Sequence, residues 1–182
     1  MGGVRYIALL RGINVGGRNI TMEVLRQHFA DFGLANVKSY IQTGNLFFDS
    51  AEEDRSILRQ RLEAHLGEAL GYSMPVCLRT LAEMESVMAL DPFTGVAVTP
   101  EVRLSVTFLA EPAVIDLPVP YRTPKGDFAL VGKTEAELFV VWHLVGGRPG
   151  NSFTLFEKAA PVPTTTRFWH TAAKILAAAK QS

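Results

Sequence analysis

Residues 37–49 read VKSYIQTGNLFFD, and this stretch decides how the first half of the chain folds. Val37–Thr43 and Leu46–Asp49 are rich in β-branched and aromatic residues, which favour strands. The Thr-Gly-Asn sequence between them is typical of a tight turn. The pattern therefore predicts two antiparallel strands joined as a hairpin, which argues against a parallel, doubly wound sheet.

Strand and helix patterns precede the hairpin. The short apolar run Tyr6–Leu10 is followed by glycine and predicts a buried strand. Thr21 is positioned to cap a helix, and Gly33 is positioned to end it. The apolar residues between them keep helical spacing at Met22, Leu25, Phe29 and Phe32.

A second helix and a further strand follow the hairpin. Ser50 and Glu53 have the spacing of a capping box, and Gly71 supplies a stop signal. The apolar face of this helix consists of Leu58, Leu62, Leu66 and Leu70. Met74–Arg79 then reads as a strand. The order β-α-β-β-α-β is that of a split βαβ, or ferredoxin-like, unit.

The second half of the chain repeats this pattern approximately, without a detectable sequence repeat. Four prolines between positions 112 and 124 exclude a long helix there but leave room for a short one. The expected elements are a helix over Leu81–Leu90, strands over Val102–Leu109, Phe128–Gly132 and Leu138–Leu144, a turn near Thr134–Glu137, and helices over Ser152–Ala160 and Phe168–Lys180. We therefore predict an α+β protein with two tandem ferredoxin-like (α/β plait) subdomains, residues 1–80 and 81–182, with antiparallel sheets and a C-terminal helix.

Composition limits the function classes. The chain has 182 residues, is 48% hydrophobic, and balances 18 basic against 18 acidic side chains. Nucleic-acid binding normally needs a basic surplus or face, so this balance argues against it without excluding a local patch. A single cysteine, Cys77, favours a reducing cytoplasm and a buried structural thiol. No signal-peptide pattern and no run near the roughly 20 apolar residues of a membrane helix are present.

Residues 9–19, LLRGINVGGRN, place a polar, glycine-rich loop directly after the first predicted strand. Gly12 and Gly17 have P-loop spacing, but Arg18 and Asn19 occupy the lysine and serine or threonine positions, and asparagine is a poor substitute for the magnesium-bound hydroxyl. One interpretation is a turn in which the glycines adopt positive φ and Asn14 caps its own turn. The other adds a polar pocket built from exposed amides, Arg11 and Asn14.

The loop, followed by Met22, Leu25 and the segment SYIQTGN, resembles the uncharacterised bacterial family catalogued as domain of unknown function 1697. The closing segment TTTRFWHTAAKIL resembles that family's Thr-Thr-Arg motif followed by Asn-Trp. The resemblance spans nearly the whole chain and implies two ferredoxin-like subdomains, but no activity. Two positions depart from it: Phe168 stands where the family tends to have asparagine, and Thr43 where it usually has serine.

No cofactor is implied and no metal site is predicted, because the four histidines have no metal-ligating residue at motif spacing. Thr164–Arg167 are expected at the amino-terminal end of the last helix, where free amides favour anions, or where Thr166 is simply a cap. Turn chemistry alone also accounts for the hairpin tip. The sharper hypothesis is one pocket for a small anionic ligand, formed by Arg11, Asn14, Gly16, Gly17, Asn19, Gln42, Thr43, Asn45, Thr165 and Arg167.

The competing account makes Arg11 and Arg167 structural, paired with carbonyls or acids that hold the two halves together. Two function classes follow. The first is a small-ligand or anion-binding protein, with enzymatic activity left open. The second is a module that binds nucleic acid or protein through a sheet face or edge. The sequence does not decide the ligand, the reaction or the oligomeric state.

Overall fold

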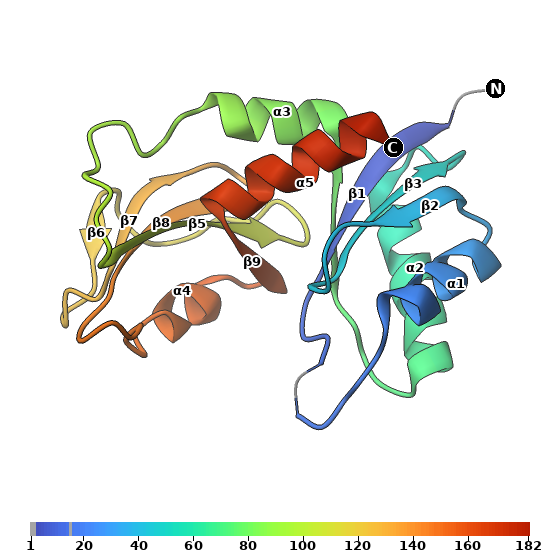
Figure 1. Cartoon of the computed structure of the whole chain (residues 1–182), viewed down its shortest axis with the longest axis horizontal. Coiled ribbons are helices and arrows are strands. Elements are labelled where there is room, and N and C mark those ends of the chain that lie inside the picture. The colour runs from blue at the N-terminus through green and yellow to red at the C-terminus, as the bar shows by residue number, and fades with distance from the viewer. Residues whose placement is uncertain (1–2, 15) are drawn as a thin grey trace. The chain divides into compact units, whose positions relative to one another are not determined.

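A computed structural model of the chain describes residues 3–14 and 16–182. It divides into two compact units, Met1–Val87 together with Ile175–Ser182, and Met88–Lys174. Each unit contains one antiparallel sheet (Figure 1). The predicted α+β class with two antiparallel sheets and a C-terminal helix is thus confirmed. The predicted boundary near residue 80 stays a prediction.

The first unit contains a four-stranded sheet in the order β2-β3-β1-β4. Its strands are β1 (Val4–Leu10), β2 (Ala35–Ser39), β3 (Asn45–Ser50) and β4 (Val76–Thr80). The central strand β1 pairs antiparallel with β3 on one side, where Tyr6 faces Phe48, and with β4 on the other, where Leu9 faces Cys77. A P-loop enzyme needs a parallel sheet, so this topology excludes that interpretation of the glycine loop.

Helices α1 (Met22–Asp31) and α2 (Arg55–Leu70) cover one face of this sheet, as Figure 1 shows. Side chains from alternate positions along the strands meet the apolar faces of both helices. Burial of this much apolar surface is the main force that holds the unit together. The buried core includes Tyr6, Ala8, Leu10, Leu25, Phe29, Leu46, Phe48, Leu58, Leu62, Leu66, Val76 and Leu78.

The helix ends confirm most of the predicted signals. Thr21 caps α1 by accepting a hydrogen bond from Val24 N at 3.2 Å. Gly33 follows that helix with φ of 99°, and Gly71 ends α2 with φ of 75°. The predicted Ser50–Glu53 capping box is wrong: Asp54 is the cap and accepts from Ser56 N and Ile57 N.

The reason for that error is local. Ser50 is the last residue of β3, and its hydroxyl accepts from Glu52 N at 3.0 Å, so it closes a turn before the helix begins. A capping box does occur at α3 (Leu81–Ala89), where Thr80 Oγ1 accepts from Glu83 N and the Glu83 carboxylate accepts from Thr80 N.

The hairpin between β2 and β3 differs from the predicted tight turn. Strand β2 ends at Ser39, so residues 40–44 form a longer connection. Ile41 and Gly44 adopt positive φ of 50° and 74°, a backbone conformation that ends the strand before Thr43. The antiparallel pairing itself is confirmed, with Lys38 facing Phe47.

The second unit contains a five-stranded antiparallel sheet in the order β6-β7-β8-β5-β9. Its strands are β5 (Val102–Leu109), β6 (Tyr121–Arg122), β7 (Phe128–Lys133), β8 (Glu137–His143) and β9 (Thr164–Phe168). The predicted turn before β8 is present, with Thr134 N donating to Glu137 O at 2.9 Å. The proline-rich segment contains β6, and its described residues form no helix, neither a long one nor the short one that the prolines left open.

The core of the second unit lies between its sheet and α4 (Thr154–Ala159). Phe156 of α4 is fully buried against it. The last helix, α5 (Trp169–Gln181), begins in this unit and ends among the residues of the first. The buried core is formed by Leu109, Ile115, Phe128, Leu130, Leu138, Val140 and Phe156.

Candidate functional site

The glycine-rich loop that follows β1 folds as a turn with positive φ. Gly12, Gly16 and Gly17 have φ of 73°, 62° and 80°, and Asn14 has φ of 56°. Asn14 Oδ1 accepts a hydrogen bond from Ile20 N at 2.8 Å, so one side chain joins the two ends of the loop. The predicted positive φ angles and the capping role of Asn14 are confirmed; Val15 lies outside the described residues.

The connection between β2 and β3 is organised by a buried amide. Asn45 is fully buried, and its Nδ2 donates to Tyr40 O at 3.2 Å and to Thr43 Oγ1 at 2.8 Å. The Tyr40 main chain returns a bond to Asn45 O at 3.0 Å. Asn45 therefore shapes the connection, while Gln42 and Thr43 are exposed on its outer side.

The two loops meet at the end of the central strand. Leu10 N donates to Gly44 O at 2.8 Å. A Cβ at Gly44 would lie 3.0 Å from Leu10 Cβ and 3.2 Å from Ile13 Cδ1, so only glycine allows this approach without displacement. The structure thus brings together two of the three polar segments that the sequence placed in one pocket.

A third segment of the same unit, residues 71–75, borders the glycine loop. Arg11 N donates to Pro75 O at 3.3 Å. The Arg18 guanidinium lies 4.1 Å from the centroid of the Tyr72 ring, a cation–π arrangement. Tyr72 was missed at the sequence level because it stands far from Arg18 along the chain. We define the anion patch as residues 11–14 and 16–19 of the loop, the connection 40–44 and residues 71–75.

Charge and exposure in the anion patch favour a negative ligand. Its three segments contain two arginines, Arg11 and Arg18, and no acidic residue. Both arginines are exposed, as are Asn19 and Gln42. Arginine presents a planar set of donors that matches carboxylate and phosphate groups.

Thr165 and Arg167 belong to the second unit. The prediction that Thr164–Arg167 open the last helix is wrong, because Thr164–Phe168 is strand β9 and the helix starts at Trp169. The β-branched threonines pair with β5, where Thr107 and Thr166 share a hydrogen bond of 2.8 Å. The helix-terminus argument for an anion at these threonines therefore fails.

Arg167 is 9% exposed, and its Nη1 donates to Thr165 Oγ1 at 2.9 Å and to Thr166 O at 2.8 Å. These bonds tie the guanidinium to its own strand. Whether Arg167 and Thr165 share a pocket with Arg11 stays a prediction. The adjacent Phe168 is 38% exposed. The centroid of its ring lies 5.4 Å from that of Trp142 and 6.0 Å from that of His170.

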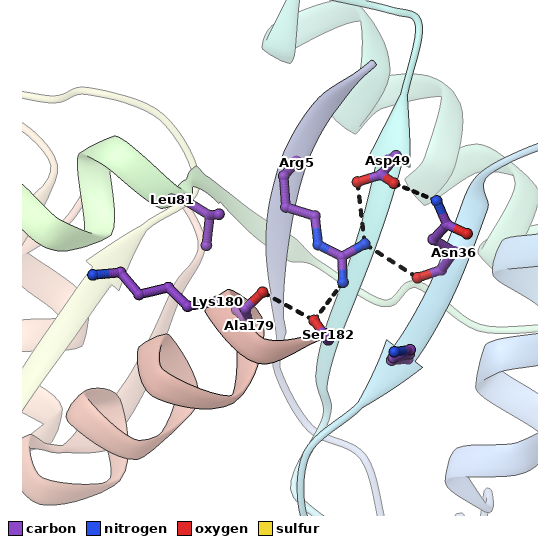
Figure 2. Close-up of a pocket in the computed structure, with 8 residues that line it drawn as sticks. Arg5, Asn36, Asp49, Leu81, Ala179, Lys180 and Ser182 are labelled. Carbon is purple, nitrogen blue, oxygen red and sulfur yellow. Dashed lines mark hydrogen bonds and ion pairs between the residues drawn. The ribbon is translucent and has the colours of Figure 1, made fainter. Parts of the chain in front are cut away.

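A separate hollow of about 370 Å³ lies on the first unit and contains residues that sequence reasoning missed (Figure 2). Arg5 Nη1 forms an ion pair with Asp49 Oδ1 at 3.1 Å and donates to Asn36 O at 3.2 Å. Its Nη2 contacts the Ser182 hydroxyl, and Lys180 pairs with Glu85. The hollow is lined by the acidic Asp49 as well as by Arg5, Lys38 and Lys180. The three segments of the anion patch, in contrast, contain no acidic residue.

Among residues 3–14 and 16–182, no three His, Cys, Asp or Glu side chains lie close enough together to form a metal site. Cys77 is buried, as predicted. Within the same described ranges, the helices are all too short or too polar to cross a bilayer.

Comparison with known proteins gives a family and a fold. A solved structure of the conserved bacterial protein SP0830 from Streptococcus pneumoniae is similar, with a TM-score of 0.67 and 24% sequence identity over 97% of this chain and 98% of that one. No curated protein matches. The model of a family described as protein of unknown function (DUF1697) matches residues 4–133, which confirms the resemblance seen in the loop motifs. The chain belongs to the DUF1697 family.

Proposed function

We propose that the first unit binds a small anionic ligand at the anion patch. The observation that carries the proposal is the hydrogen bond from Leu10 N to Gly44 O, which joins the loop bearing Arg11 and Arg18 to the connection bearing Gln42. Donor side chains from separate segments are thereby held at the end of one strand. A phosphate, sulfate or carboxylate group would accept charge-assisted hydrogen bonds from them.

The role of Arg18 follows from its contact with Tyr72. The guanidinium carbon lies 4.1 Å from the centroid of the Tyr72 ring, so the cation is in contact with the ring. A contact of this kind limits the rotamers of a long side chain, so less entropy is lost when an anion binds. Arg11 adds a second positive charge from the other end of the same loop.

Calorimetric titration with inorganic phosphate, at constant ionic strength set with chloride, tests the proposal. We expect saturable binding with a Kd at or below roughly 1 mM. Arg11→Gln and Arg18→Gln should each weaken binding by about tenfold or more, the usual value of a charge-assisted bond. The matched control is Arg61→Gln, an exposed arginine on α2 outside the anion patch.

Thermal unfolding with and without phosphate separates the two accounts of Arg11. A binding arginine leaves the melting temperature nearly unchanged when it is replaced and removes protection by phosphate. A structural arginine lowers the melting temperature itself. Equal phosphate affinity in Arg11→Gln, Arg18→Gln and Arg61→Gln would remove the anion patch from consideration.

The alternative of a nucleic-acid-binding module that uses the face of the first sheet receives less support. On the face of the first sheet opposite α1 and α2, Ile7, Leu9, Phe47 and Cys77 are each at most 2% exposed. Base stacking requires accessible aromatic rings on the sheet, which these residues do not provide.

We also infer that each unit is a ferredoxin-like plait. The strand order β2-β3-β1-β4 of the first unit, with both helices on one face, supports this for residues 4–80. In the second unit β7-β8-β5-β9 repeats that order, with β6 added at the edge and a non-helical segment between β5 and β7. A superposition of an experimentally determined structure of this chain on ferredoxin-like proteins tests the inference.

A further inference from the structure

We infer that the second unit contains a separate binding site for a small amphipathic anion, meaning an apolar body that carries one carboxylate or a similar group. The site is a cavity of about 330 Å³ at the start of β5 and α5. Its walls are largely apolar, and two nitrogen-bearing side chains, Arg103 and His170, line it as well. A volume in the range of roughly 300–1,000 Å³ with few polar groups is typical of small-molecule sites.

The cavity exists because strand β9 is shorter than its neighbour. Strand β5 starts at Val102, but its pairing with β9 covers only Ser105–Leu109, and the chain turns into α5 directly after Phe168. The first residues of β5 therefore have no strand beside them on that edge. The apolar walls of the space are Val98, Val102, Leu104 and Trp169.

The wall formed by Trp169 is fixed by aromatic packing. Its ring meets Phe93 and Phe139 edge to face, with centroids 5.3 and 6.0 Å away. Phe139 is 2% exposed and Phe93 is 6% exposed, so both rings are buried. A ring held in this way presents a constant surface to a ligand, which lowers the entropic cost of binding.

The side chains of Arg103 and His170 are also held in place, and each keeps nitrogen atoms that can donate hydrogen bonds to a ligand. Arg103 Nη1 donates to Pro100 O at 2.8 Å and to Val102 O at 2.9 Å, but its Nε and Nη2 make no hydrogen bond to any residue that the structure describes. The His170 ring is stacked on Phe168 at an interplanar angle of 11°, and its nitrogens likewise make no bond within the described ranges. An anionic group at the rim could accept from both side chains, while the apolar body lies against Trp169.

The apolar body and the charge can be tested separately with three probes. Octanoate has both features, octanol lacks the charge, and acetate lacks the apolar body. Calorimetry should show saturable octanoate binding with a Kd below roughly 1 mM, weaker octanol binding and no measurable acetate binding. In a Trp142→Phe background, Trp169 is the remaining tryptophan, so its fluorescence should change along the same isotherm.

Two variants and one control decide the outcome. Arg103→Gln should weaken octanoate binding by about tenfold or more and leave octanol binding unchanged. Val98 is 74% exposed, so Val98→Trp can fill the cavity without disturbing the core and should abolish the binding of both probes. Arg148→Gln, an exposed arginine outside the cavity, should bind octanoate like the unmodified protein.

The proposal is overturned if octanoate does not bind saturably, or if Arg103→Gln and Arg148→Gln behave alike. It does not depend on the anion patch of the first unit, because the variants lie in different units. Loss of octanoate binding in Val98→Trp, with phosphate binding by the first unit retained, would show that the two sites are independent.

Discussion

Asp127 and Gly150 lie so close together that a side chain at position 150 would have to displace its surroundings. A Cβ built on Gly150 would lie 2.0 Å from Asp127 Oδ2. Asp127 is 3% exposed and accepts hydrogen bonds from Thr123 Oγ1 at 2.6 Å and from Ser152 N at 3.2 Å. The carboxylate thus joins the turn before β7 to the loop before α4.

Gly150→Ala should destabilise the second unit. The added methyl group must displace Asp127 or the loop main chain, and such overpacking costs roughly 1–3 kcal/mol. Urea unfolding measures the change. Gly67→Ala is the matched control, because Gly67 lies within α2 with only an ordinary contact near its Cβ position, and alanine there should be neutral or stabilising. Equal stability of the two variants would show that a methyl group at position 150 does not clash with Asp127.

Asp127 should also make stability depend on pH. Burial alone would raise the pKa of Asp127, but hydrogen bonds from Thr123 and Ser152 outweigh it and hold the pKa below its ordinary value. Stability from a carboxyl with a lowered pKa is present above the unfolded-state value of about 3.9 and is lost as the pH falls through the folded-state value.

Unfolding in urea between neutral pH and acid tests this expectation. Asp127→Asn should be less stable near neutrality and should lose less stability on acidification than the unmodified protein. Glu83 will contribute a similar dependence, since its pKa is also lowered: burial opposes the shift, and hydrogen bonds from Thr80 and Arg55 outweigh it. If the stability of Asp127→Asn depends on pH in the same way as that of the unmodified protein, Asp127 is not the source of the pH dependence.

Asn14 is expected to set the conformation of the glycine loop. Asn14→Ala removes the acceptor for Ile20 N and places alanine at a φ of 56°, so we expect a loss of roughly 1–2 kcal/mol. Asn14→Gly removes only the hydrogen bond, because glycine tolerates the positive φ, and this variant should lose less stability than Asn14→Ala. Amide exchange at Ile20 reports the bond directly, and protection that survives in both variants would show that it does not form.

Gly44→Ala should affect both stability and phosphate binding. Its φ of 74° and the 3.0 Å approach to Leu10 Cβ leave no space for a methyl group, and we expect a loss of roughly 1–3 kcal/mol. The displaced connection would separate Gln42 from the glycine loop and weaken phosphate binding. A variant that is destabilised but binds phosphate normally would show that the connection is not part of the anion patch.

The first sheet was predictable because its signals are local. The apolar run Tyr6–Leu10, the Thr21 cap and the Gly71 stop each act within a few residues, so composition and spacing reveal them. The Thr164–Arg167 segment misled for the same reason. Threonine favours both strands and helix caps, and only pairing with β5, which is distant in sequence, decides between them.

The site contacts were less accessible to sequence reasoning. Arg18 over Tyr72, Asp127 against Gly150, and Arg103 beside Trp169 join residues that are well separated along the chain. The polarity of the glycine loop was evident, and so was its turn geometry. The order of the strands in the sheet decides which segments border the loop. The sequence pattern predicts that order only by way of the fold that it predicts.

The bond between Asn14 and Ile20 has a kinetic consequence for any ligand of the anion patch. It joins the two ends of the glycine loop in the ligand-free protein, so binding needs no separate closing step. Association should then follow a single exponential whose rate rises linearly with ligand concentration, with no plateau from a slow isomerisation. Added salt should slow that rate, because two arginines attract the approaching anion through solvent that ions screen.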